Sequence, residues 1–185
     1  MKAMVMRTEI RSIMLLMAAL IMVVGYGCGD DDDADNGAAL ASIAQTAIDD
    51  GRFTTLVAAL QAAELDDDLA GNGPFTVFAP TDDAFNLLPP GTVTTLLQPA
   101  NQALLIDILT YHVYVGNVLA ADAIALDGQT VTMLNGDGMT IDVVGGDVVL
   151  NLGGNREATV IITDVLCSNG TIHVIDAVLD PADAP

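Results

Sequence analysis

Residues 73–85 read GPFTVFAPTDDAF, and within this stretch the chain changes from a strand pattern to a helix pattern. The apolar run FTVFAP (75–80) follows a turn and ends in proline, which predicts a short buried strand. Thr81 can then cap a free amide of a new helix, whose positive end suits Asp82 and Asp83. The two acids could also be taken for a catalytic pair, but nothing nearby would tune one carboxylate against the other. The stretch therefore predicts a strand followed by a capped helix.

Apolar residues spaced three and four positions apart predict three more helices. They cover residues 40–48, a segment from Phe53 to the acidic run 66–68, and residues 101–112. The last of these helices places four residues on one face: Leu105, Ile108, Leu109 and His112.

Beyond Tyr111 the pattern changes to short apolar runs separated by glycine-containing turns, which is typical of antiparallel strands. The predicted strands are 112–118, 129–134, 139–144, 147–152, 158–167 and 171–179. Because helices gather in the first half and strands in the second, the sequence predicts the α+β class. We expect an antiparallel β-sandwich or wedge with several flanking α-helices.

Residues 1–27 have the pattern of an export signal, with a basic start and twelve uncharged apolar residues. That run is shorter than the roughly 20 residues of a spanning helix. Cys28 follows a small residue, as at the processing site of bacterial lipoproteins, although Gly25 stands where a leucine-like residue is usual. We therefore expect a lipid on Cys28 and an extended acidic tether over 28–37. Plain secretion after cleavage near Gly27, or an uncleaved anchor, are the alternatives.

Without residues 1–27 the chain keeps two basic residues, Arg52 and Arg156, against 24 acidic ones, a net charge of −22. Such a charge repels phosphate backbones, so the sequence excludes nucleic acid as a partner, and it offers no basic patch for anionic lipid. Once Cys28 is acylated, Cys167 is the one remaining thiol, so we expect no internal disulfide. Cys167 lies in a strand pattern and is expected to pack as a small hydrophobe.

No sequence pattern calls for a cofactor or a metal. Adjacent aspartates at 30–33 do not present the spaced oxygens of a calcium loop. Residues 135–142 lack the oxygen spacing of an EF-hand, and residues 145–155 match a calcium β-roll only at their glycines. The chain beyond residue 27 also lacks CxxC, HExxH and GxSxG motifs and a phosphate-binding glycine loop.

Three stretches together resemble the fasciclin-like domain family: 73–85, LIDILTYHVYVGNV (105–118) and SNGTIHVIDAVLDP (168–181). The resemblance spans residues 38–181, which leaves 182–185 as a tail, and it implies the α+β fold expected above. It also implies that the matching residues of the first and third stretches are structural: Thr76, Phe78, Ala79, Pro80, Thr81, Phe85, Asn169, Gly170, His173 and Asp176.

The resemblance further implies a non-enzymatic adhesion or interaction module. Animal members of the family bind integrins through a segment whose residue types match Asp107, Ile108, Leu109, Tyr111 and His112. The match is incomplete, because Ile106 stands where the animal motif has lysine. A bacterium has no integrins, so the expected partner is an unidentified surface protein or polysaccharide. The expected location is the cell envelope, at the outer membrane or cell surface rather than free in the periplasm.

The two histidines are expected to belong to the core. His173 alternates with Ile172 and Val174 in a strand that is apolar on both faces, which is typical of a central strand. A zinc or catalytic role would need converging ligands, which two histidines and one cysteine do not offer. His112 ends a helix, where the dipole would favour some protonated character. Tyr111, one residue earlier, is expected to point elsewhere, either partly to solvent with a surface function or into packing.

Two other functions are weighed against adhesion. A carrier or sensor would hold an apolar or sterol-like molecule in a groove between helices and sheet, and would show a continuous apolar cavity. A hydrolase would place a serine or carboxylate within hydrogen-bond reach of a histidine in a cleft. An adhesion module would show an exposed Tyr111 or an apolar rim. We expect adhesion and no enzyme activity; the oligomeric state is left open.

Overall fold

The computed structural model describes residues 40–71, 73–152 and 156–181. They belong to a compact unit that runs from Ala38 to Pro185. The predicted export signal and the tether with Cys28 lie outside the described residues. No helix in the described ranges is long and apolar enough to cross a membrane.

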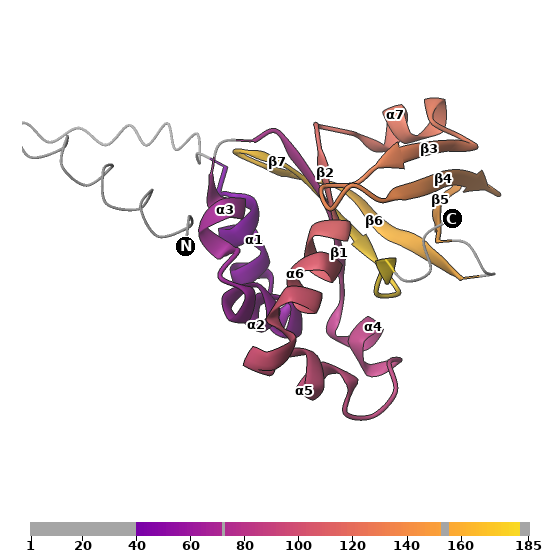
Figure 1. The fold of residues 1–185 in the computed structure, drawn as a ribbon. Helices are drawn as coiled ribbons and strands as arrows, with labels where there is room; N and C mark the ends of the chain where they lie inside the picture. Colours follow the sequence, from indigo (N-terminus) through magenta and orange to yellow (C-terminus); the bar gives the residue numbers. More distant parts are fainter. Residues whose placement is uncertain (1–39, 72, 153–155, 182–185) are drawn as a thin grey trace, which may run out of the picture. The chain divides into compact units, whose positions relative to one another are not determined.

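The described residues form seven strands and seven α-helices (Figure 1). The helices are α1 (Ile43–Asp50), α2 (Thr54–Ala63), α3 (Asp66–Ala70), α4 (Asp82–Asn86), α5 (Thr92–Leu96), α6 (Gln102–Tyr111) and α7 (Ala120–Ala125), with a 3-10 turn, η2, at Pro99–Asn101. The strands are β1 (Phe75–Pro80), β2 (Val113–Val115), β3 (Gln129–Thr132), β4 (Gly138–Val144), β5 (Asp147–Asn151), β6 (Glu157–Cys167) and β7 (Gly170–Ile175).

The strands make one sheet in the order β2-β1-β7-β6-β5-β4-β3. This sheet curls towards a barrel, because the backbone N–H of Leu134, just beyond edge strand β3, donates to the carbonyl oxygen of Val113 on edge strand β2 at 2.8 Å. Helices α1 to α6 lie beside the half of the sheet formed by β2, β1 and β7, whereas α7 lies by β3 and β4 at the other end (Figure 1). The predicted α+β class is confirmed.

The prediction of a wholly antiparallel sheet is wrong at one pair. β1 runs parallel to β7, from Phe75 opposite Gly170 to Pro80 opposite Ile175. Glycine turns show that consecutive strands fold back as hairpins, but β1 and β7 are separated by most of the domain. A long connection permits either direction, so the turns could not reveal this pairing.

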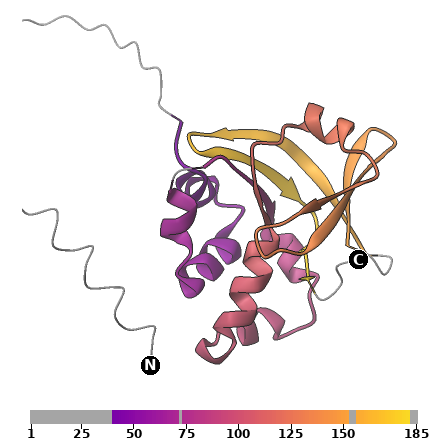
Figure 2. The same cartoon turned by 45° about the horizontal axis from the view of Figure 1, so that its top comes forward.

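The sheet is curled, as Figure 2 shows, and it separates two cores of buried side chains. The helix-side core lies between the helices and β1 and β7 and includes Phe53, Leu56, Leu60, Leu105, Leu109, Val77 and Ile172. The sheet-interior core includes Phe78, Tyr111, Met139, Ile141, Leu150, Val160 and Ile175. Successive residues of a strand point to opposite faces, so β1 and β7 serve both cores and are apolar on both sides. Cys167 packs in the helix-side core, and burial raises the pKa of its thiol.

The helix after β1 begins as predicted, since the Oγ1 atom of Thr81 accepts from the N–H of Ala84 at 3.3 Å. Asp82 has a second role: its carboxylate accepts from the amides of Thr54 and Thr55 and from the Thr54 hydroxyl, and so caps α2. Burial tends to raise the pKa of Asp82, but these hydrogen bonds outweigh it and lower the pKa. Asp82 therefore caps α2, a role that the sequence did not predict for it.

Three short helices depart from the sequence prediction. The acidic run that was expected only to end α2 forms α3, and α5 and α7 fall in segments for which no helix was predicted. Each spans five or six residues, which is too short to display a helical repeat of apolar positions.

Candidate functional site

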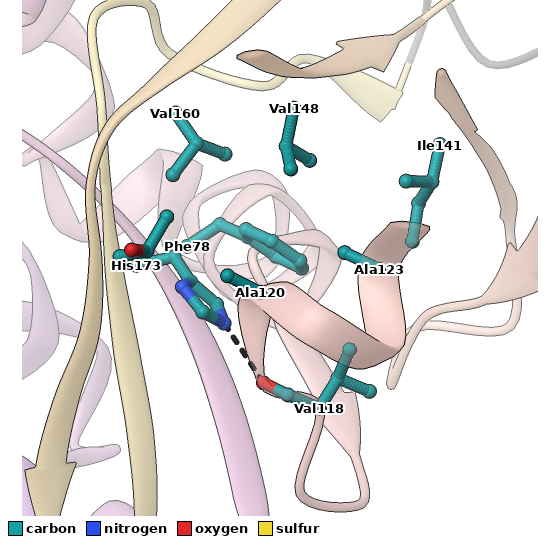
Figure 3. Close-up of a pocket in the computed structure, with 9 residues that line it drawn as sticks. Phe78, Val118, Ala120, Ala123, Ile141, Val148, Val160 and His173 are labelled. Atoms are coloured by element: carbon teal, nitrogen blue, oxygen red, sulfur yellow. Dashed lines mark hydrogen bonds between the residues drawn. The ribbon is translucent and has the colours of Figure 1, made fainter. Parts of the chain in front are cut away.

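His173 lies in the core and is 3% exposed. The backbone N–H of Asp164 donates to its Nδ1 atom at 3.3 Å, so the proton is on Nε2, which donates to the carbonyl oxygen of Val118 at 2.8 Å (Figure 3). Its ring also stacks on Phe78, with 5.7 Å between ring centroids. Both ring nitrogens are therefore engaged by backbone groups.

The cavity beside His173 is too small for a substrate (Figure 3). Its volume is about 10 Å³, room for a single water at most, and its walls include Phe78, Ile141 and Val160. No three His, Cys, Asp or Glu side chains converge on a metal-sized space anywhere in the described ranges. The surroundings of His173 are those of a packed side chain rather than of a proton-transfer site.

Polar residues of the first and third family stretches fix the loop after β2. The Thr76 hydroxyl donates to the carbonyl oxygen of Gly116 and accepts from the N–H of Val118, at 2.8 and 2.9 Å. The Thr171 hydroxyl donates to the Oδ1 atom of Asn117 at 2.6 Å. Together with the bond from His173 to Val118, these contacts hold residues 116–118 against β1 and β7.

Asn169 and Gly170 connect the start of β7 to its surroundings. The Asn169 side chain accepts from the N–H of Ile43 and donates to the carbonyl oxygens of Leu69 and Gly71, which joins α1, the end of α3 and β7. At Gly170, where φ is +154°, a Cβ atom would collide with the carbonyl oxygen of Phe75. Glycine is therefore required by the close approach of the two parallel strands.

The Tyr-His segment is buried. Tyr111 is 0% exposed, and its hydroxyl donates to the carbonyl oxygen of Gly138 at 2.9 Å. His112 is 2% exposed; its Nδ1 atom donates to the carbonyl oxygen of Ile108 at 2.8 Å, and its Nε2 atom accepts from the N–H of Leu179 at 3.0 Å. All four ring nitrogens of the two histidines thus bond to the backbone, which leaves none to activate a serine or a carboxylate.

The structure decides between the alternatives for Tyr111 and corrects the expectation for His112. Tyr111 does not reach solvent, because the end of α6 lies between the two cores: Leu105 and Leu109 enter the helix-side core while Tyr111 enters the sheet-interior core. His112 is not protonated at neutral pH, because desolvation by burial lowers its pKa to about 4 and outweighs both the hydrogen bond to Ile108 and the charge of Asp180, which raise it.

The remaining candidates divide between the two sides of α6. Leu109 is buried, Ile108 is half-buried and Asp107 is exposed. One turn earlier, Leu104 is 50% exposed, and the spacing of three and four residues puts it beside Asp107 and Ile108.

The turn between β3 and β4 adjoins this exposed side of α6. The Nδ2 atom of Asn135 donates to Asp107 at 3.2 Å, and Leu134 is 45% exposed. We call these residues the outer face: Leu104, Asp107, Ile108, Leu134 and Asn135. Sequence reasoning identified Asp107 and Ile108 but missed the two leucines and Asn135, whose proximity depends on the packing of the β3–β4 turn.

Comparison with known proteins identifies the family. The family model of the Fasciclin domain matches residues 51–181. Two Synechocystis proteins are similar over 140 residues, or 76% of this chain: protein sll1483 is 48% identical over 73% of its own length, and the uncharacterized protein sll1735 is 49% identical over 98%. The immunogenic protein MPB70 of Mycobacterium bovis is 34% identical over 86% of this chain and 82% of its own length.

A solved structure supports the same assignment at the level of the fold. The FAS1 domain pair of the insect cell adhesion molecule Fasciclin I superposes with a TM-score of 0.69 at 20% identity. The match covers 80% of this chain and 54% of the domain pair, so this chain spans about half of it. The chain belongs to the fasciclin domain family.

Proposed function

We propose that this protein is a non-enzymatic adhesion module that binds a protein or polysaccharide at the cell surface, where a lipid on Cys28 anchors it. The outer face carries the proposal, because it exposes two leucines around an acidic residue on fixed elements. The relationship to a domain pair from a cell adhesion molecule supports it.

The outer face suits recognition because its backbone is held from behind. Leu105, Leu109 and Tyr111 on the opposite side of α6 are almost completely buried. A side chain presented by such a fixed helix loses less freedom on binding than one on a free loop, so more of the contact energy remains as affinity. Exposed apolar residues beside a polar group also match the usual composition of a binding patch.

The charge of the chain restricts the partner. From Cys28 onwards the net charge is −22, which would repel an acidic polysaccharide or an acidic protein. We therefore propose a neutral or basic partner. Added salt should slow association with a basic partner and leave binding to a neutral one almost unchanged.

Anchoring at Cys28 would leave the domain close to the membrane. Eleven residues lie between Cys28 and Leu40, at the start of the described domain, so the tether spans at most about 40 Å when extended. Metabolic labelling with an alkyne-bearing fatty acid tests this part: the full chain should become labelled, and Cys28→Ser should not. Equal labelling of both would exclude Cys28 as the lipid site.

Adhesion itself is tested by binding of the full chain to the producing cells and to their extracellular protein and polysaccharide. The variant Leu104→Ser should lose at least tenfold in affinity. The matched control is Ile124→Ser, since Ile124 is also an apolar helical residue, 62% exposed, but lies on α7. Equal loss in both variants, or no saturable binding by the unmodified chain, would contradict the proposal.

A further inference from the structure

An apolar pocket lies where α2, α3 and α6 meet β1 and β2. Its volume is about 180 Å³. Its floor is made by buried side chains, Leu60, Leu69, Leu109 and Val113, and its rim includes the exposed residues Asp68 and Leu134. The pocket is therefore closed by the helix-side core on the inside and accessible from solvent at the rim.

The size of this pocket sets it apart from packing defects elsewhere in the domain. The cavity beside His173 measures about 10 Å³, and another between α1, α2 and β7 about 20 Å³. Protein interiors are close-packed, with few voids larger than a water molecule. A larger hollow of about 510 Å³ lies around Asn169 and Gly170, but it is wide open to solvent and its lining is partly polar. Among the enclosed apolar spaces of the described residues, the pocket of about 180 Å³ therefore has the form of a binding site.

We propose that this pocket binds a small apolar molecule about the size of one substituted benzene ring. An apolar cavity of about 150 Å³ lined by leucine, isoleucine and phenylalanine holds benzene, so the volume and the walls both fit such a ligand. The proposal goes beyond adhesion, because it concerns a ligand of another class in the space behind the outer face, with Leu134 shared by the two sites. Of the apolar or sterol-like ligands that the sequence left open for a groove between helices and sheet, the volume fits a small apolar one, since drug-sized molecules occupy about 300–1,000 Å³.

The rim restricts the charge of the ligand. Asp68 places a carboxylate at the opening, and the rest of the chain is strongly acidic. The Thr110 hydroxyl, the other polar group of the lining, already donates to the carbonyl oxygen of Ile106 at 2.7 Å. The site therefore accepts uncharged or amine-bearing aromatic molecules and excludes carboxylates.

The test uses three probes of similar size: toluene, 2-phenylethylamine and 3-phenylpropionate. They are titrated into the full chain in lipid nanodiscs while the methyl resonances of Leu69, Leu109 and Val113 are followed by NMR. Toluene and 2-phenylethylamine should shift these resonances saturably, and 3-phenylpropionate should bind at least tenfold more weakly. No saturable shift with any probe would overturn the site, and equal binding of all three would overturn the chemical class.

Two variants locate the binding. Leu134→Trp should block the opening and weaken toluene binding at least tenfold. The control Leu87→Trp should leave toluene binding unchanged, because it places the same bulk on an exposed leucine that belongs neither to the pocket lining nor to the outer face. Asp68→Asn should allow 3-phenylpropionate to bind. Such a gain of binding cannot be explained by misfolding of the variant. Toluene binding unchanged by Leu134→Trp, or continued exclusion of 3-phenylpropionate by Asp68→Asn, would contradict the assignment.

Discussion

The two sides of α6 have different surroundings although they come from one short stretch. On the inner side, Tyr111 and His112 at the helix end are sealed between two cores and bonded to distant backbone groups. On the outer side, Leu104 and Asp107 are exposed. The family resemblance located this segment, but burial decides which of its residues can touch a partner. The comparison teaches that the Tyr-His pair contributes to the fold, and it leaves the exposed neighbours as the residues that we propose for contact.

The largest expected effect is on the inner side. Tyr111→Ala removes a fully buried aromatic ring from the sheet-interior core and should lower the free energy of unfolding by about 3–5 kcal/mol. Urea unfolding followed by far-UV circular dichroism measures this loss. A change below about 1 kcal/mol would show that Tyr111 is not a core residue and would remove the contrast between the two sides.

His112 should make the inner side sensitive to acid. Its folded-state pKa is about 4 against 6.5 for an ordinary histidine, so its contribution is fully present above pH 6.5 and is lost as the pH falls towards 4. A difference of this size corresponds to roughly 3 kcal/mol. Urea unfolding between pH 7 and 4 should show this loss, and His112→Gln should lack that part of the pH dependence. Parallel pH profiles for the two proteins would contradict the neutral, buried state of His112.

Removal of the cap on α2, which lies away from α6, should have an intermediate effect on stability. Asp82→Ala should lower the free energy of unfolding by about 0.5–2 kcal/mol, because the amides of Thr54 and Thr55 lose their acceptor. The neighbouring Asp83 is exposed, so Asp83→Ala should change stability by less than about 0.5 kcal/mol. Equal losses, measured by chemical unfolding, would show that helix-dipole charge rather than the cap is responsible.

The smallest effect on stability belongs to the outer face. Leu104→Ser should change the free energy of unfolding by less than about 0.5 kcal/mol, because half of this side chain is already in water. A loss near that of Tyr111→Ala in thermal or urea unfolding would mean that both sides of α6 support the core.

The elements that were predicted well are those with a local signal. FTVFAP and TIHVI are short runs with apolar residues on both faces, so β1 and β7 could be located. Thr81 lies where a helix cap is required, so the start of α4 could be located too. The features that were missed depend on residues far apart in the chain. The parallel pairing of β1 with β7 and the cap that Asp82 supplies to α2 are examples.

The candidate site shows the same limit. Periodicity placed Leu105 and Leu109 on the buried face of α6 correctly, but for Tyr111, off that face, it left both solvent and packing open. It could not show that the start of β4 covers the other side of the helix end, where Gly138 receives the Tyr111 hydroxyl. The exposure of the outer face and the existence of the pocket behind it also depend on tertiary packing, so the sequence could not predict them.

The central claim is that the inner side of α6 stabilises the fold while the outer face makes contact, and paired variants test it most directly. Tyr111→Phe removes only the hydroxyl bonded to Gly138, and Asp107→Ala removes only an exposed carboxylate. Both are measured for unfolding free energy and for binding to the producing cells. We predict that Tyr111→Phe loses about 1 kcal/mol of stability with unchanged binding, and that Asp107→Ala keeps its stability and binds at least fivefold more weakly. Loss of binding in a stably folded Tyr111→Phe, with full binding by Asp107→Ala, would contradict the account.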